Sequence, residues 1–254
     1  MSKSIGDKFE SLYLSGKKGL AWLVDPDDVD GYTSFSQNIQ KAIKAKIDFF
    51  FLGGSLLQRN NISETIQLIK KQCAEIPVIL FPGSAMQFSD EADGMLFLSL
   101  ISGRNPDLLI GQHVSIALEL AKSSVEILPT GYMLIDGGEK TAVHYISQTI
   151  PLPNHHPELS VATALAGKFL GLKYFYLDAG SGAPDPVSPE IIRAVKNAIK
   201  APLIVGGGLN SLEKIKLAYQ SGADLVVLGN AVVQNMELLE EVSSFLETIH
   251  VRVN

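Results

Sequence analysis

The stretch LIVGGGLNSLEKIKLAYQSGADLVVLGN, residues 203–230, contains the pattern on which the fold prediction rests. Two short apolar runs, 203–205 and 225–228, each end in a glycine turn, and an amphipathic segment of helical length, 212–220, lies between them. Neither run alternates polar with apolar residues, which is typical of parallel strands covered on both faces. The stretch therefore predicts a strand, a helix and a second strand parallel to the first.

The same unit recurs along the chain. Eight apolar runs are bounded by Gly, Pro or Asp, namely 20–24, 49–52, 78–81, 95–101, 126–128 with 132–135, 174–177, 203–205 and 225–228. Most are separated by amphipathic segments of helical length, namely 34–46, 63–74, 108–123, 158–171, 189–199 and 212–220, and a last one, 236–249, follows. This alternation predicts the α/β class and one domain over 1–254, a closed (β/α)8 or TIM barrel. An open doubly wound sheet is the alternative, because one sequence does not fix the strand count.

One connection departs from the pattern. Residues 82–93 are polar, turn-prone and without helical periodicity, and about a dozen residues is near the lower limit for a crossover. We therefore expect a loop in place of the third helix. Two helix starts show capping chemistry: Ser188 precedes Pro189, and Asn210 is followed three residues later by Glu213, which resembles a capping box.

Composition excludes several classes of protein. Hydrophobic residues make up 46% of the 254 residues, which is enough for a large core. The net charge of -6 gives no cationic field for nucleic acid or an anionic membrane. No apolar run approaches the ~20 residues of a membrane-spanning helix, the polar start lacks a secretory signal, and Cys73 is the only cysteine. We expect a cytoplasmic protein with no transmembrane segment and no nucleic-acid partner.

Glycine turns follow the last two predicted strands. In a barrel of this kind the working residues lie at the carboxyl ends of the strands. The turns that contain Gly207, Gly208 and Gly229 let backbone N–H groups approach phosphate oxygens, and a helix amino terminus adds partial positive charge. We interpret them as a phosphate site, which lets an acidic protein bind an anion. The alternative is that the glycines serve only tight turns.

Two other strand ends carry oxygen ligands. Asp25 follows the first run and Ser55 follows the second. Mg²⁺ prefers hard oxygen ligands and shares its shell with water and substrate phosphates, so this pair is a candidate magnesium site. The alternative for Asp25 is a turn-capping carboxylate beside Pro26.

A third carboxylate ends the sixth run. Alternation places Tyr176 and Asp178 on the same side of that strand, where the carboxylate can act as a base. An ion pair or a turn role is the alternative. Four other apolar and aromatic residues near the barrel mouth are assigned to the core rather than to an apolar channel: Phe88, Leu100, Tyr132 and Tyr145.

Taken together, six segments resemble the geranylgeranylglyceryl phosphate synthase family, which includes a heptaprenylglyceryl phosphate synthase branch. They are Leu23-Val-Asp-Pro-Asp, Leu52-Gly-Gly-Ser, Phe81-Pro-Gly-Ser, Tyr176-Leu-Asp-Ala-Gly-Ser-Gly-Ala, Val205-Gly-Gly-Gly-Leu and Val227-Leu-Gly-Asn. The likeness covers essentially the whole chain, and the family barrel also lacks its third helix. It implies a Mg²⁺-dependent prenyltransferase of ether-lipid synthesis that joins geranylgeranyl diphosphate to the C3 hydroxyl of sn-glycerol 1-phosphate and releases diphosphate. It also implies a homo-oligomer.

Position by position, the resemblance implies a set of site residues. The Mg²⁺ ligands would be Asp25 and Ser55, and the base would be Asp178, oriented by Tyr176. The glycerol phosphate contacts would be Tyr176, Leu177, Asp178, Ala179, Gly180, Ser181, Gly182, Gly207, Gly208, Gly229 and Asn230. The apolar prenyl tail needs a groove, for which the missing third helix offers a place.

Three positions depart from the family pattern. Asp178 stands where the family usually has glutamate, and Asp28 stands where a lysine often follows the Asp-Pro-Asp motif. Leu23 replaces a lysine of the heptaprenyl-using relatives, which favours geranylgeranyl diphosphate over the longer heptaprenyl substrate. Two further functions stay open: a sugar-phosphate isomerase or lyase with the same phosphate loops, and a non-catalytic barrel that binds phospholipid precursors.

Overall fold

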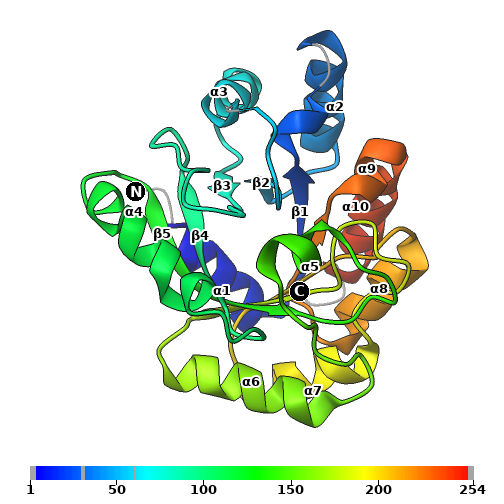
Figure 1. The fold of residues 1–254 in the computed structure, drawn as a ribbon. Coiled ribbons are helices and arrows are strands. Elements are labelled where there is room, and N and C mark those ends of the chain that lie inside the picture. Colours follow the sequence, from blue (N-terminus) through cyan, green and yellow to red (C-terminus); the bar gives the residue numbers. More distant parts are fainter. Residues whose placement is uncertain (1–3, 30–31, 60, 251–254) are drawn as a thin grey trace.

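Eight parallel strands close into a barrel in chain order, in a computed structural model that describes residues 4–29, 32–59 and 61–250 (Figure 1). The eighth strand pairs with the first, with Leu20 opposite Val226. The strands are β1 (Gly19–Val24), β2 (Phe49–Leu52), β3 (Val78–Leu80), β4 (Gly94–Leu100), β5 (Glu126–Leu134), β6 (Tyr174–Asp178), β7 (Leu203–Gly206) and β8 (Leu225–Leu228). The predicted (β/α)8 barrel is confirmed, and the open sheet is wrong. One detail differs: β5 is a single strand that runs through Pro129.

Helices surround the barrel. The longer ones are α2 (Tyr32–Lys44), α3 (Ile62–Gln72), α4 (Gln112–Leu120), α6 (Pro157–Phe169), α7 (Pro189–Ile199), α8 (Leu212–Ser221) and α10 (Glu237–His250). Shorter pieces are the 3-10 turn η1 (Pro26–Asp28), the π-helical turn η2 (Asp107–Gly111), α5 (Ala142–Ser147) and α9 (Asn230–Gln234). Each predicted helix is present within a few residues of its expected bounds, and 108–123 is divided between η2 and α4.

No helix lies among the described residues between β3 and β4, where a regular (β/α)8 barrel has its third helix, as the sequence predicts. Residues 81–93 cross between α3 and α4 as a loop (Figure 1). Gln87 is buried and fixes this loop: its Nε2 donates to the carbonyl of Gly54 at 2.8 Å, and its Oε1 accepts from the amide of Gly83 at 2.9 Å. A polar side chain therefore holds this connection against the barrel, as the apolar face of a helix does in the other connections.

The core has two layers, because alternate strand residues face opposite sides of the barrel. Phe49 and Phe51 of β2 pack inside the barrel, whereas Phe50 and Leu52 pack between the barrel and the helices. Both sets are fully buried. This double burial explains why the strands appear in the sequence as continuous apolar runs.

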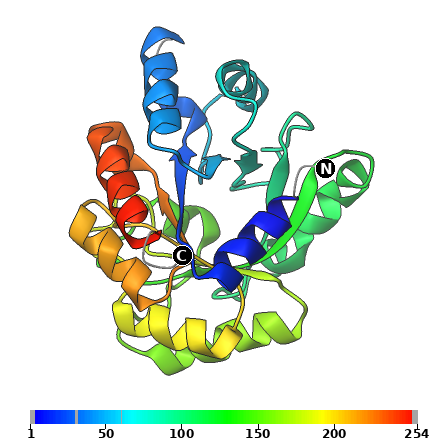
Figure 2. The same ribbon diagram turned by 180° about the vertical axis from the view of Figure 1, so that it is seen from behind.

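A helix that the sequence analysis missed, α1 (Ile5–Ser15), closes the amino-terminal end of the barrel (Figure 2). Its Phe9 is buried and packs edge-on against Phe49 and Tyr174, with ring centroids 5.0 and 5.2 Å apart. The Glu126 carboxylate accepts from the amides of Ile5 and Gly6 at 2.7 and 2.8 Å. The other end of the barrel is thus the open one.

The helix starts bear out one capping prediction and correct the other. Ser188 caps α7 by accepting from the amide of Ile191. The cap of α8 is Ser211, which accepts from the amide of Lys214, and not Asn210. Asn210 instead belongs to the preceding turn, where its amide donates to the carbonyl of Gly208 at 3.1 Å. In the part of the chain described, no helix is long and apolar enough to cross a membrane.

Candidate active site

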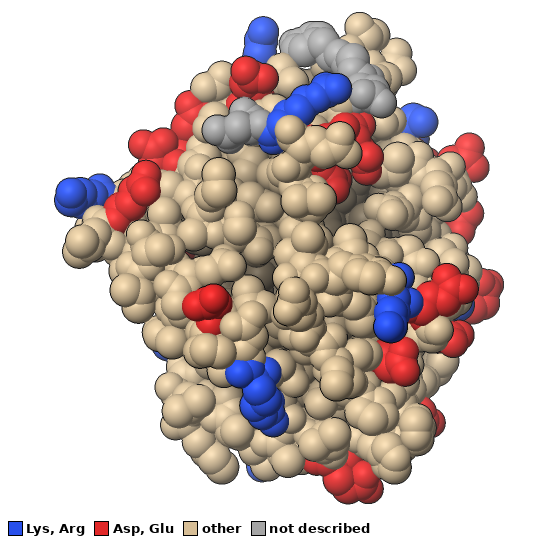
Figure 3. All heavy atoms as spheres, in the orientation of Figure 1, with Lys and Arg blue, Asp and Glu red and all other residues tan. Residues whose placement is uncertain are grey.

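A cavity of about 560 Å³ opens at the carboxyl end of the barrel, and segments that follow or end all eight strands contribute to its wall. The face of the molecule in Figure 3 is hollowed near its centre, and most atoms around the hollow belong to uncharged residues. This is the end at which a barrel of parallel strands carries its working residues.

Most of the predicted site residues meet in this cavity. Those that line it are Asp25, Ser55, Tyr176, Asp178, Ser181, Gly182, Gly207, Gly208, Gly229 and Asn230. Leu177 and Ala179 do not: they are fully buried in the layer between barrel and helices, because they alternate with Tyr176 and Asp178 along the chain. Any contact of Leu177 or Ala179 with the acceptor would therefore be made by the backbone and not by the side chain. Gly180 enters the site through its amide, which binds Asp178.

The glycine turns form one wall of the cavity. Gly182, Gly207 and Gly208 have φ angles of 75°, 79° and 68°, in the left-handed region that glycine adopts most easily. At Gly207 a Cβ atom would lie 2.5 Å from Asp178 Oδ1 and 2.6 Å from the Gly180 amide nitrogen, so no side chain fits. Gly229 precedes α9, which begins at Asn230. Backbone amides can therefore approach an anion here without side chains between them.

Asp178 is the buried acid of the site. Its Oδ2 accepts from the Tyr132 hydroxyl at 2.6 Å, and its Oδ1 accepts from the Gly180 amide at 2.7 Å. Burial raises the pKa of the Asp178 carboxyl, while these two hydrogen bonds and the nearby His144 oppose the rise. Such a carboxylate is a stronger base than one in water.

The side chain that holds the Asp178 carboxylate is Tyr132. This corrects the sequence analysis, in which Tyr176 was expected to orient that carboxylate. The Tyr176 hydroxyl instead lies against Gly206, where a Cβ would collide with it. Tyr132 is opposite Tyr176 in the register of β5 and β6. The sequence analysis assigned Tyr132 to the core; it is buried as expected, but its hydroxyl has a specific task. Tyr145, also assigned to the core, is 70% exposed on α5.

Asp25 lies on the opposite side of the cavity. Its Oδ1 accepts from the Asp27 amide at 3.0 Å, so it does cap η1, as the alternative interpretation held. Its Oδ2 lies against Gly54 and accepts no hydrogen bond from a described residue. Asp28 and Ser55 line the same part of the cavity. Asp27 turns away and accepts from the amides of Gln58 and Arg59.

These oxygens fit a divalent cation. Burial raises the pKa of the Asp25 carboxyl, and the neighbouring charges of Asp28 and Asp27 add to the rise. No Lys, Arg or His among the described residues forms an ion pair with Asp25. The described part of the chain has no group of three or more His, Cys, Asp or Glu that could hold a metal. Mg²⁺ usually completes its shell with water and substrate oxygens, so Asp25 and Ser55 are the residues of this wall that could hold it.

The remaining wall is apolar and lies on the side of the missing helix. Leu98 and Leu100 of β4 and Leu108 of η2 contribute to it, so Leu100, which the sequence analysis assigned to the core, is buried but also lines the cavity. Phe81 stacks on Tyr176 with ring centroids 5.1 Å apart and lies 5.9 Å from the Tyr132 ring. His113 of α4 also lines the wall, and burial lowers its pKa, which favours the neutral ring. This side can accept a long apolar group.

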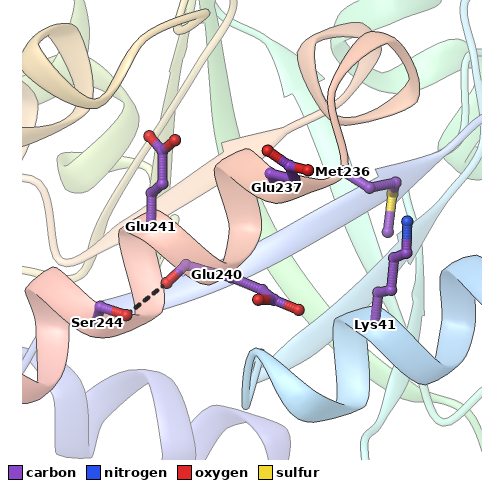
Figure 4. A pocket seen from close by; sticks show the side chains of 6 residues that line it. All are labelled: Lys41, Met236, Glu237, Glu240, Glu241 and Ser244. Atoms are coloured by element: carbon purple, nitrogen blue, oxygen red, sulfur yellow. Dashed lines mark hydrogen bonds between the residues drawn. The ribbon is translucent and has the colours of Figure 1, made fainter.

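A second hollow, of about 410 Å³, lies between α2 and α10 (Figure 4). It is lined by Lys41, Met236, Glu237, Glu240, Glu241 and Ser244. Its polar groups are those of exposed helix faces: Ser244 Oγ donates to the Glu240 carbonyl, and the Glu240 carboxylate pairs with Lys44 at 3.1 Å. We assign it no role in the chemistry.

Glycine turns after the seventh and eighth strands, and a buried carboxylate at the same opening, are the arrangement found in TIM-barrel enzymes that bind phosphate. The sequence profile of the PcrB family matches residues 18–248. The chain belongs to the PcrB family.

Relatives and solved structures agree with this assignment. The geranylgeranylglyceryl phosphate synthase of Spirosoma linguale is 50% identical, over 91% of this chain and 92% of its own. That of Chitinophaga pinensis is 45% identical, over 96% of each. The crystal structure of the Thermoplasma acidophilum synthase with its substrate sn-glycerol-1-phosphate superposes with a TM-score of 0.88 at 28% identity, over 95% of this chain and 98% of that one. The resemblance inferred from the sequence is confirmed.

Proposed function

We propose that this chain is a geranylgeranylglyceryl phosphate synthase, which forms an ether bond between the C3 hydroxyl of sn-glycerol 1-phosphate and geranylgeranyl diphosphate. The observation that carries the proposal is one cavity with three unlike walls: glycine amides beside a buried carboxylate, a half-buried aspartate beside a hydroxyl, and an apolar face. A phosphorylated alcohol, a diphosphate and a prenyl chain need these three walls. The relatives that carry this activity in their names support it.

The glycine wall binds the phosphate of the acceptor. The amides around Gly182, Gly207 and Gly208, together with the start of α9, supply donors and partial positive charge without a cationic side chain. Holding the phosphate there fixes the glycerol carbons next to Asp178. Orientation of this kind removes a large part of the entropic barrier of a two-substrate reaction.

Asp178 acts as the base. The C3 oxygen forms its bond to the first carbon of the prenyl group, the bond between that carbon and the diphosphate oxygen breaks, and Asp178 takes the hydroxyl proton. Its burial favours proton uptake. Asp178 is one methylene shorter than glutamate, but the Tyr132 and Gly180 contacts hold its carboxylate at the cavity wall.

Asp25 and Ser55 would hold Mg²⁺, which neutralises charge on the departing diphosphate when bound. Asp28 lines the same wall in place of the family lysine. The side chains of Asp25 and Asp28 both repel an anion, so the diphosphate needs a cation between itself and the protein.

The prenyl chain lies along Leu98, Leu100 and Leu108. Leu23 also lines the cavity, where the heptaprenyl-using relatives have lysine. We propose geranylgeranyl diphosphate as the donor, with heptaprenyl diphosphate as the alternative. An isomerase or lyase of small sugar phosphates would have no use for this apolar wall.

The test is direct. Purified protein is incubated with Mg²⁺, sn-glycerol 1-phosphate and farnesyl, geranylgeranyl or heptaprenyl diphosphate, and ether products are measured by mass spectrometry. We expect most product with the geranylgeranyl donor, and none after chelation of Mg²⁺. Absence of product at every chain length would refute the synthase function, and product from only the sn-3 isomer would refute the acceptor.

Two further expectations accompany this proposal. The chain is expected to form a homo-oligomer, as the family resemblance implies, and light scattering after size-exclusion chromatography measures its mass. One unpaired cysteine suits a reducing compartment, so we propose that the enzyme works in the cytoplasm, which cell fractionation tests.

A further inference from the structure

The Asp178 carboxylate is held at two points, and only one of them is a side chain. Gly180 holds Oδ1 through its amide, as part of the same turn, and Tyr132 holds Oδ2 from the neighbouring strand at 2.6 Å. Both Asp178 and Tyr132 are more than nine-tenths buried. A hydrogen bond of this length to a charged oxygen, away from water, is among the strong ones in proteins.

We propose that Tyr132 is a positioning residue of the transfer reaction, which fixes the short Asp178 carboxylate against the acceptor hydroxyl. The inference rests on the proposed function. The lone pairs of Asp178 that Tyr132 and Gly180 do not use remain available to a hydroxyl in the cavity. Without Tyr132, one carboxylate oxygen loses its anchor and the group can rotate away.

Among the described residues, Tyr132 is the one side chain that donates a hydrogen bond to the Asp178 carboxylate. Three titratable groups face Asp178: Tyr132 on β5, His144 on α5 and Tyr176 on β6. Tyr176 directs its hydroxyl toward Gly206, and Nδ1 of His144 accepts from the amide of Thr141 at 3.0 Å. The adjoining residues of β7 and its turn, Gly206 and Gly207, have no side chain.

Tyr132 is itself well fixed. Its ring lies 5.9 Å from that of Phe81 and 5.5 Å from that of Tyr176, centroid to centroid. Burial raises the pKa of the Tyr132 phenol well above its usual value, so the hydroxyl keeps its proton and stays a donor. The same ring lines the cavity, so one residue connects the apolar wall to the base.

The test is the variant Y132F, which keeps the ring and removes only the hydroxyl. We expect kcat to fall about tenfold or more, a part of the 10²–10⁴ that a positioned base supplies, while KM for sn-glycerol 1-phosphate changes less than about threefold. A donor to a carboxylate lowers its pKa, so its loss shifts the acidic limb of the pH–rate profile upward by about one unit.

Two further variants separate positioning from simple destabilisation. Y219F removes another buried hydroxyl, which donates to the Gly19 carbonyl at 2.7 Å far from the cavity, and should lower stability without changing kcat. In a D178N background, where no base remains, adding Y132F should cost less than about threefold in kcat. An equal loss in both backgrounds, or a Y132F enzyme with the wild-type kcat and acidic limb, would overturn the inference.

A readout independent of turnover keeps this test apart from that of the function. In protein labelled with ¹³Cγ-aspartate, the Asp178 resonance is assigned with D178N and titrated. Its pKa should rise by about one unit in Y132F. An unchanged pKa would refute the contact, even if the wild-type protein formed no ether product and the proposed function failed.

Discussion

Replacement of Gly207 by alanine tests whether the glycine wall is a binding surface. The residue has a φ of 79°, so an alanine there costs about 1–2 kcal/mol from backbone conformation alone. The added Cβ would also lie 2.5 Å from Asp178 Oδ1, 2.6 Å from the Gly180 nitrogen and 2.7 Å from the Ala179 nitrogen. Two of these atoms are backbone, which no change of rotamer can move aside.

The expected result follows from these contacts. Either the turn after β6 or the turn after β7 has to shift, which displaces the phosphate from the base. A displacement of about 1 Å can cost about 100-fold in rate. We therefore expect kcat/KM of G207A to fall about 100-fold or more, with a raised KM for sn-glycerol 1-phosphate.

Gly16 offers a matched control. It has a φ of 70°, and an added Cβ there would have no atom within 4 Å. It ends α1, at the closed end of the barrel. G16A should therefore lose about 3 °C in Tm from the same backbone cost and keep its activity. Product formation and calorimetric binding of sn-glycerol 1-phosphate are measured for both. If G207A binds and turns over within about threefold of G16A, the glycines serve only the turns.

Three other perturbations have defined outcomes. D25N keeps the shape of the side chain but removes its charge, and we expect Mg²⁺ affinity, measured calorimetrically with diphosphate present, to fall about 100-fold or more. F9A should lower stability by about 3–5 kcal/mol, seen in denaturant titration, with little change in activity at low temperature. Burial raises the pKa of the Asp48 carboxyl in the folded state. The contribution of protonated Asp48 to the free energy of unfolding is therefore complete below pH ~4 and is lost as the pH rises through the folded pKa. The Tm of D48N minus that of the wild type should thus increase from pH 4 to 7 in calorimetry.

Strand positions were predictable because a parallel strand buried on both faces leaves an unbroken apolar run. The gathering of Asp25, Ser55 and Asp178 followed from the same reasoning, since the carboxyl ends of parallel strands meet at one opening. The contact between Tyr132 and Asp178 was not predictable. It depends on how far two side chains on neighbouring strands reach, and the sequence spacing of 46 residues has no information on that.

α1 was missed for a different reason. Its apolar residues Ile5, Phe9 and Leu12 have helical spacing, and it is as long as α3 and α7, but it precedes the first strand, outside the alternation of strand and helix on which the prediction rested. Its stability comes from packing on the barrel interior and from Glu126, more than 100 residues away. Leu177 and Ala179 show the converse limit: a motif names a whole segment, whereas strand alternation lets only every second side chain reach the cavity.

Aspartates occur at both ends of the strands, and their position relative to the strand separates their roles. Asp48, Asp93 and Asp224 directly precede β2, β4 and β8. Each accepts a hydrogen bond at 2.8 Å from the first or second backbone amide of the preceding strand. The donors are the amides of Leu20, Val78 and Leu203, respectively. Among the even-numbered strands β6 is the exception, since Lys173 precedes it, and no aspartate directly precedes an odd-numbered strand. On the neighbouring strand β5 the first residue, Glu126, accepts from the backbone of α1 and not from that of a strand.

Carboxylates at the closed end thus serve the backbone of the barrel. Asp25 follows β1 and Asp178 is the last residue of β6, and each still presents carboxylate oxygen to the cavity after its hydrogen bonds are made. Because the backbone amides at that end belong to turns rather than to the sheet, their donors can be given to a ligand without weakening the barrel. The same residue type therefore stabilises the fold before a strand and is free for chemistry after one.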